Sequence, residues 1–354
     1  MEASRSRRHV LKTFIRSFLL AALCSISLLV IAAPLSAQKK ILVIDTQKTG
    51  WPADAAVARK KYLDANGFVE GKDLTVVSVS VENDETKAAA LLAEELPKNY
   101  NVIVLNGTIP ARAAKKAAFG TKQPFVFAGV TDPVGVGIIA DFKTAPTANF
   151  TGVSFPVPVR SRLAFIKQVM PKVKKIGLIY ADMPQSHSYK TWLDDAIAGD
   201  PSLKGMQVIY RMVPAVTGET GPQQMADAAK AYVQELDAQV DLFISANDQM
   251  GVSKQFPMMV YQTAKKPLCG LGRSDVMDGL GATMSIYPVF DTFGVQSGRM
   301  IAELLKGKKV SDLVPEWPKQ NGVAFDLGKA KKFGISVPVG LLELAGPNVV
   351  RAAK

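Results

Sequence analysis

The run Lys40-Ile-Leu-Val-Ile-Asp45 is followed by a helical stretch from Ala53 to Asn66, which closes at Gly67. A short apolar run rich in β-branched residues is typical of a buried strand. A glycine directly after a helix supplies the left-handed residue that ends many helices. This strand and helix are the first unit of a pattern that recurs along the chain, so they decide the fold class.

The same alternation continues to the middle of the chain and then restarts. Further strands are predicted at 74–81, 101–105, 124–127, 175–180, 206–213 and 241–245, with helices at 85–96, 110–118, 160–169, 189–198 and 223–236. Strands alternating with helices are typical of parallel sheets that are covered by helices on both faces. The fold class predicted is therefore α/β, with doubly wound parallel sheets.

A break between two halves is predicted at Phe155-Pro156-Val157-Pro158, whose prolines stiffen an extended connector. Two more connectors are expected at 282–288 and 316–323, which makes three crossings between two lobes. The first lobe would comprise 38–156 plus about 286–318, and the second 157–285 plus about 319–354. We therefore expect two lobes joined by a three-segment hinge.

Residues 1–37 have the order of an export signal. A basic head with paired arginines at positions 7 and 8 precedes an apolar stretch from Phe18 to Ala33, and small residues surround Ala37. Cleavage before Gln38 is expected, so the mature chain would work in the periplasm. The paired arginines leave both the Sec and the twin-arginine routes open, and an uncleaved anchor is a further alternative.

Composition narrows the class of partner. The formal net charge is +12, but the basic residues are interleaved with acidic ones, so a solvated surface is favoured and no nucleic acid is expected. Once Cys24 leaves with the signal, Cys269 is alone and cannot form an intramolecular disulfide. Cys269 is interpreted as a core thiol in a short buried strand. A monomer is expected.

Polar residues follow the predicted strands, where open parallel sheets bind their ligands. The loops in question contain Thr46 and Gln47, Asn106 to Thr108, Thr131 to Pro133, Gln185 to Ser188, and Asn247 to Gln249. These loops are therefore the candidate binding surface.

Individual residues in these loops carry a binding and a structural interpretation. Thr108 and Ser188 precede predicted helices, so they either help to bind an anion or cap the helix. Asp248 is the natural partner of a ligand ammonium group, and alternatively it caps the helix that follows. Trp51, Tyr180 and Tyr287 either stack on a ligand or pack in the core.

No catalytic set emerges from the sequence. His187 is the single histidine after residue 37, so a histidine metal cluster is excluded and a Ser-His-Asp triad would have to use that residue. No nucleophile elbow, phosphate-binding loop or Cys-x-x-Cys occurs. We expect no enzyme activity, no metal and no cofactor.

Several stretches together resemble the periplasmic substrate-binding proteins of ABC importers, in the tryptophan/tyrosine-type group. The stretches are Leu63 to Lys72, Asn106 to Ala114, Thr131 to Gly137, Asn149 to Ser154, Arg162 to Lys172 and Ala330 to Pro338. The resemblance implies the type I periplasmic binding fold and a receptor that closes on a small polar solute, an amino acid or related carboxylate, and delivers it to a membrane permease.

Carried over by position, the resemblance implies ligand contacts at Gln47, Thr108, Ser186 or Ser188, and Asp248. The chain departs from the family around Gly272 to Gly279. This stretch is expected to bring Arg273 near the cleft between the lobes, which would allow a more acidic solute to bind. The candidate ligand-binding set is Gln47, Thr108, Thr131, Ser186, Ser188, Asp248, Arg273 and Tyr287. The alternative function is an exported hydrolase that uses Asp248 or His187 between the lobes.

Overall fold

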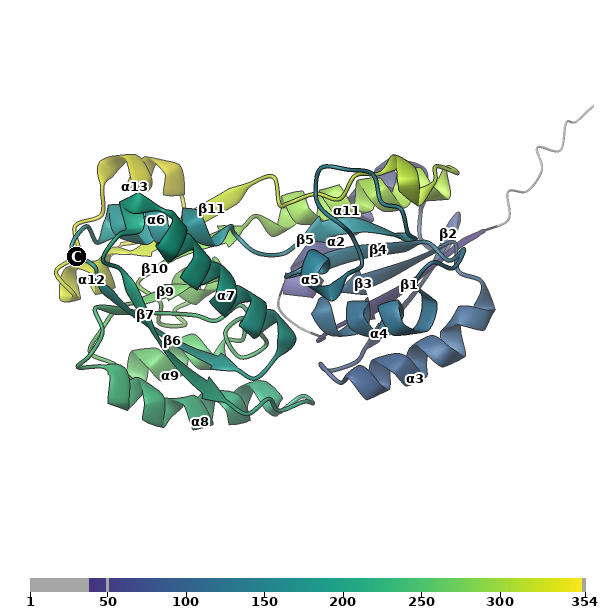
Figure 1. Ribbon diagram of the computed structural model, residues 1–354. Coiled ribbons are helices and arrows are strands. Elements are labelled where there is room, and N and C mark those ends of the chain that lie inside the picture. Colours follow the sequence, from purple (N-terminus) through teal and green to yellow (C-terminus); the bar gives the residue numbers. More distant parts are fainter. Residues whose placement is uncertain (1–37, 49–50, 352–354) are drawn as a thin grey trace, which may run out of the picture. The chain divides into compact units, whose positions relative to one another are not determined.

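The computed structural model describes residues 38–48 and 51–351. The predicted signal lies outside the described residues. From Lys39 onward the chain forms one unit, which contains two sheets with helices on both faces (Figure 1). No helix among the described residues has the length and apolarity that a membrane crossing needs.

The first sheet has five parallel strands in the order β2-β1-β3-β4-β5. Its strands are β1 (Lys39–Asp45), β2 (Leu74–Ser80), β3 (Val102–Asn106), β4 (Phe125–Val130) and β5 (Phe150–Ser154). The helices of this half of the chain are α2 (Trp51–Ala65), α3 (Glu85–Glu95), η1 (Leu96–Lys98), α4 (Thr108–Ala118) and α5 (Pro133–Val136). Successive side chains of β1 point to opposite faces of the sheet. Ile41 and Val43 therefore pack towards α2 on one face, whereas Leu42 and Ile44 pack towards α3 and α4 on the other.

The second sheet has seven strands in the order β12-β11-β10-β9-β8-β6-β7, and only the pair β10–β11 is antiparallel. Its strands are β6 (Lys175–Ala181), β7 (Gln207–Val213), β8 (Leu242–Ile244), β9 (Leu268–Gly270), β10 (Met284–Pro288), β11 (Asn321–Asp326) and β12 (Val349–Val350). The helices around it are α6 (Val159–Val169), α7 (Pro184–Gly199), η2 (Pro201–Leu203), α8 (Gly221–Leu236), α9 (Gln255–Thr263), α10 (Ser274–Met277), α12 (Leu327–Lys332) and α13 (Val339–Ala345). The mainly parallel α/β class predicted from the sequence is confirmed.

Helix α11 (Phe290–Leu305) comes late in the chain but packs against α2 in the core of the first sheet (Figure 1). The 3-10 helix η3 (Val310–Asp312) follows it, and Leu313 joins the same core. The chain therefore passes between the sheets three times, after Ser154, after Pro288 and before Asn321.

One predicted connector is wrong. Segment 282–288 is not itself the connector, because Met284 to Pro288 form the buried strand β10 between β9 and β11, and the crossing comes after Pro288. The interpretation of Cys269 as a core thiol is confirmed, since it lies in β9 with no exposed surface.

Candidate functional site

A cavity of about 40 Å³ lies at the carboxyl ends of the strands of both sheets, and we call it the central cavity. From the first half of the chain it is lined by Thr46, Gln47, Trp51, Asn83, Gly107, Thr108, Gly129 and Thr131. From the crossing segment and the second half it is lined by Phe155, Gln185, Asn247, Asp248, Gln249 and Val252. Parallel strands place their following loops at one edge, which is why residues so distant in sequence meet here.

Three buried polar atoms in this wall have no hydrogen-bond partner among the described residues. They are Nδ2 of Asn83, Oε1 of Gln185 and Oε1 of Gln249. The other end of the Asn83 amide is engaged, because its Oδ1 accepts from the Thr46 hydroxyl at 2.7 Å. A buried polar atom without a partner costs about 1–3 kcal/mol. The cavity therefore has one donor and two acceptors that a polar guest would satisfy.

The start of α4 adds backbone donors to the same wall. Gly107 precedes the helix with φ of 109°, and a Cβ at this position would lie 2.8 Å from the Cβ of Thr46. Only glycine fits both the positive φ and the close approach. Because the first amide groups of a helix lack partners within it and lie at the positive end of its dipole, this end of the cavity favours a carboxylate.

The buried carboxylate of Asp248 accepts several hydrogen bonds from the protein itself. Its Oδ2 accepts from the backbone N–H of Ala181 at 2.8 Å and from the Ser186 hydroxyl at 2.9 Å, and its Oδ1 accepts from the N–H of Gly251 at 2.8 Å. Burial raises the pKa of Asp248, and these hydrogen bonds oppose that rise. Its contacts fix the loop after β8, which presents Asn247 and Gln249 to the cavity.

An apolar wall faces these polar groups. The Trp51 indole packs against Phe155 at 5.1 Å between ring centroids and edge-on against Phe293 at 5.7 Å. Gly129 makes room for it, because a Cβ there would lie 2.1 Å from the indole. Val252 completes the apolar lining. A guest with a polar end and an apolar body matches this division of the wall.

One hydrogen bond joins the two halves of the wall directly. The Asn247 amide donates from Nδ2 to the Thr131 hydroxyl at 2.9 Å, and both side chains are buried. Thr131 follows β4 and Asn247 follows β8. The bond therefore links the carboxyl ends of the two sheets beside the cavity.

The structure brings together four of the eight predicted site residues in the cavity wall: Gln47, Thr108, Thr131 and Asp248. Ser186 is buried directly behind Asp248, to which it donates. The remaining residues, Ser188, Arg273 and Tyr287, are not among the lining residues. Ligand contact by any of the eight stays a prediction.

The three outlying residues have other surroundings. Ser188 does not precede a helix, because α7 begins four residues earlier at Pro184. Arg273 is exposed and donates from Nε to Oδ1 of Asn348 at 2.7 Å. Tyr287 is buried in β10, and its ring packs on Gly322 so closely that a Cβ at position 322 would lie 2.6 Å from it.

Sequence reasoning missed Asn83 and gave no separate role to Gln185 or Gln249. Asn83 follows β2 with a left-handed φ of 59°, a conformation that asparagine adopts more readily than most residues. The tripeptide Glu82-Asn83-Asp84 after a strand was the available signal. The two glutamines stood inside loops that the sequence did mark.

The hydrolase alternative gains no support from the geometry. His187 is exposed, and its Nε2 lies 2.7 Å from Oδ1 of Asp182. Asp248 is bonded to Ser186 and to backbone amides, with no histidine contact among them. Across the described residues no three His, Cys, Asp or Glu side chains gather as metal ligands would.

Comparison with known proteins defines the class. Residues 58–349 match the model of the family described as ABC transporter substrate binding protein, and the chain belongs to this family. It is a family of solute-binding proteins and not of enzymes.

One relative and two solved structures are similar to most of the chain. The chain is 23% identical over 254 residues to a tyrosine-binding protein of Clostridioides difficile, covering 72% of this chain and 68% of the relative. An ABC domain in complex with L-Trp from Streptococcus pneumoniae has a TM-score of 0.73 and 22% identity, over 89% of this chain and 100% of that chain. A conserved domain protein from Vibrio cholerae has a TM-score of 0.76 and 23% identity over the same shares. The fold shared with these structures is the type I periplasmic binding fold.

The buried carboxyl group of Asp275, in α10, is expected to make the stability of the protein depend on pH. Its buried Oδ2 accepts from the N–H groups of Leu271 and Gly272 at 2.8 and 2.9 Å, and burial raises the pKa of the carboxyl to about 6. The folded state thus holds this proton more tightly than the unfolded state, so stability is present at low pH and is lost as pH rises through about 6.

We expect Asp275→Asn to raise the free energy of unfolding by about 2 kcal/mol at about pH 7.5, with the gain vanishing near about pH 4. Urea unfolding of both proteins at the two pH values measures it. The exposed Asp227→Asn is the matched control and should show no such pH-dependent gain. A gain of equal size at both pH values would contradict the assignment.

Proposed function

We propose that this chain is the receptor of an ABC importer in the periplasm, and that it binds a zwitterionic solute, an amino acid or related carboxylate, in the central cavity. The single observation that carries the proposal is the set of unpaired atoms on Asn83, Gln185 and Gln249. A buried donor and two buried acceptors match a carboxylate and an ammonium group.

The chemistry of the wall supports the position of each ligand group. The carboxylate lies at the start of α4, where Asn83 Nδ2 and the helix dipole favour negative charge. The ammonium group donates to the amide oxygens of Gln185 and Gln249. The apolar body lies against Trp51, Phe155 and Val252. Relatives described as tyrosine-binding or in complex with L-Trp support an amino acid with an aromatic side chain as the first candidate.

Binding requires the lobes to separate and close. A free volume of about 40 Å³ is far below the roughly 300–1,000 Å³ of small-molecule sites. The polar wall comes from both halves of the chain, so a guest that contacts both halves favours the closed population. The closed form is then the one presented to a membrane permease.

The experiment is a calorimetric titration of the purified protein with the amino acids and simple carboxylates, L-tyrosine and L-tryptophan first. We expect a saturable ligand, with Gln249→Leu weakening its affinity about 10- to 100-fold because the ligand donor loses its buried acceptor. The exposed Gln234→Leu on α8 is the matched control. Turnover of a ligand, or an affinity unchanged by Gln249→Leu, would contradict the proposal.

A further inference from the structure

A second and larger cavity lies beside the first crossing segment, and we call it the hinge cavity. It encloses about 750 Å³ and shares Thr131 alone with the lining of the central cavity. Its walls include Phe142 from the first half of the chain, Trp192 on α7, the crossing segment 156–159, and Trp317 from the last crossing. The volume is within the range of small-molecule sites, about 300–1,000 Å³.

Aromatic surface is left open in this cavity. Trp317 stacks on Phe142 with 4.3 Å between centroids and 29° between planes, yet 38% of Trp317 stays exposed. Val134, in the same wall, is 42% exposed. Single exposed apolar residues are ordinary, but a concave group of large ones marks a binding surface.

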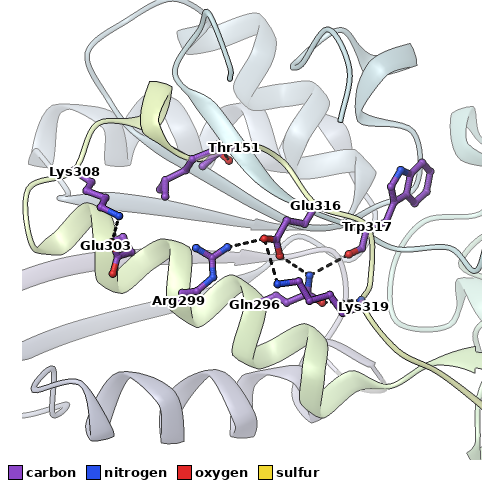
Figure 2. Close-up of polar contacts among 9 residues, drawn as sticks. Thr151, Gln296, Arg299, Glu303, Lys308, Glu316, Trp317 and Lys319 are labelled. Carbon is purple, nitrogen blue, oxygen red and sulfur yellow. Dashed lines mark hydrogen bonds and ion pairs between the residues drawn. The ribbon is translucent and has the colours of Figure 1, made fainter. Parts of the chain in front are cut away.

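A polar cluster holds the Trp317 backbone in place (Figure 2). Glu316 accepts from Arg299 at 2.8 Å and from Gln296 at 2.6 Å, and Gln296 also donates to the Trp317 carbonyl at 3.0 Å. The Glu316 backbone pairs with β5, because its carbonyl accepts from the N–H of Ser154 at 2.9 Å. Figure 2 shows the indole directed away from this cluster. The held backbone and the stack on Phe142 together restrict the ring, which lowers the entropy cost of binding.

The charges in the wall indicate the sign of the guest. Three carboxylates line the cavity, on Asp132, Asp141 and Asp195, against Lys143 and Arg160. Arg160 is already paired with Asp200 at 3.6 Å, whereas Asp132 and Asp141 accept from backbone N–H groups of their own loops. The lining of this cavity has more acidic than basic side chains, although the whole chain has a formal net charge of +12. Cations are also attracted to the faces of indole rings.

We propose that the hinge cavity is a second ligand site, which binds a small organic cation with an aromatic or apolar body, such as an aromatic amine or a quaternary ammonium compound. The ring lies between Trp317 and Trp192, and the cationic group lies towards the carboxylates. Because the walls come from both lobes and two crossing segments, such a guest also favours one lobe arrangement over others.

The test is a calorimetric titration of the whole protein with benzyltrimethylammonium. We expect saturable binding with a Kd on the order of 1 mM or below, weakened about tenfold by Trp317→Ala and by Asp195→Asn. Phenylacetate, which has the ring but the opposite charge, should bind more weakly. Trp317→Phe keeps a ring and should retain most of the affinity.

Two variants separate this site from other effects. Asp227→Asn removes an exposed carboxylate on α8 and should leave the affinity for the cation unchanged. Gln249→Leu alters the central cavity and should also leave it unchanged. The proposal is overturned if no saturable binding occurs, if Trp317→Ala and Asp195→Asn bind the cation as well as the parent protein does, or if phenylacetate binds equally well.

Discussion

Replacing Arg162 by methionine should lower the free energy of unfolding by about 4 kcal/mol. The Arg162 guanidinium is fully buried beside the second sheet. It donates to the Tyr189 hydroxyl at 2.8 Å and to the carbonyls of Ser245, Cys269 and Gly270 at 3.0, 2.9 and 3.2 Å. Methionine fills much of the space but donates nothing, so three buried carbonyls each lose a donor, and of these the Cys269 carbonyl still accepts from the N–H of Ser245.

Urea unfolding of the parent protein and the variant measures this loss. The matched control is Arg160→Met, two residues earlier on the same helix with an exposed side chain, and its effect should stay within about 0.5 kcal/mol. The carbonyls that Arg162 binds are at the ends of β8 and β9, directly before the loops of the central cavity and of Asp275. A loss for Arg162→Met no larger than for the control would show that these bonds contribute little.

Gly129→Ala should cost about 3 kcal/mol and also disturb the central cavity. Gly129 has φ of 72°, and an added Cβ would lie 2.1 Å from the Trp51 indole. The indole cannot shift away from the added Cβ easily, because Phe155 and Phe293 pack against it. Backbone strain and overpacking therefore act together.

Gly120→Ala separates these two costs. Gly120 has a similar φ of 76°, but nothing lies within 4 Å of the added Cβ, so only the backbone strain of about 1–2 kcal/mol applies. Thermal or urea unfolding of the two variants gives the difference that comes from the Trp51 contact. Equal losses in both would contradict a steric role for Gly129. The proposed ligand should also bind more weakly to Gly129→Ala than to Gly120→Ala.

The sequence predicted those parts of the fold that depend on local pattern. The apolar run at Lys40–Asp45 is strand β1 (Lys39–Asp45), and the helix after it starts at Trp51. Segment 282–288 was predicted as a connector, but its residues 284–288 pair with β9 and β11 inside the second sheet. Only the neighbouring strands reveal that it is central.

For the candidate site, the sequence located the loops but not the role of each residue. Asp248 stood out as a ligand partner because it is charged, yet burial and four protein groups around it show how much of its bonding serves the loop itself. Asn83 and Gln249 carry no charge and gave little signal, although their free atoms line the cavity. Which polar atoms stay unpaired depends on long-range contacts that no local pattern records.

The late position of α11 has a consequence for synthesis on the ribosome. Phe293, Met300 and Leu305 belong to the same apolar core as β1 and α2, more than half the chain earlier. The apolar core beside the first sheet cannot be completed until residues near 305 have been made, so a nascent or truncated chain that stops at Pro158 leaves apolar surface uncovered. Exposed apolar surface of this kind makes such intermediates prone to aggregation.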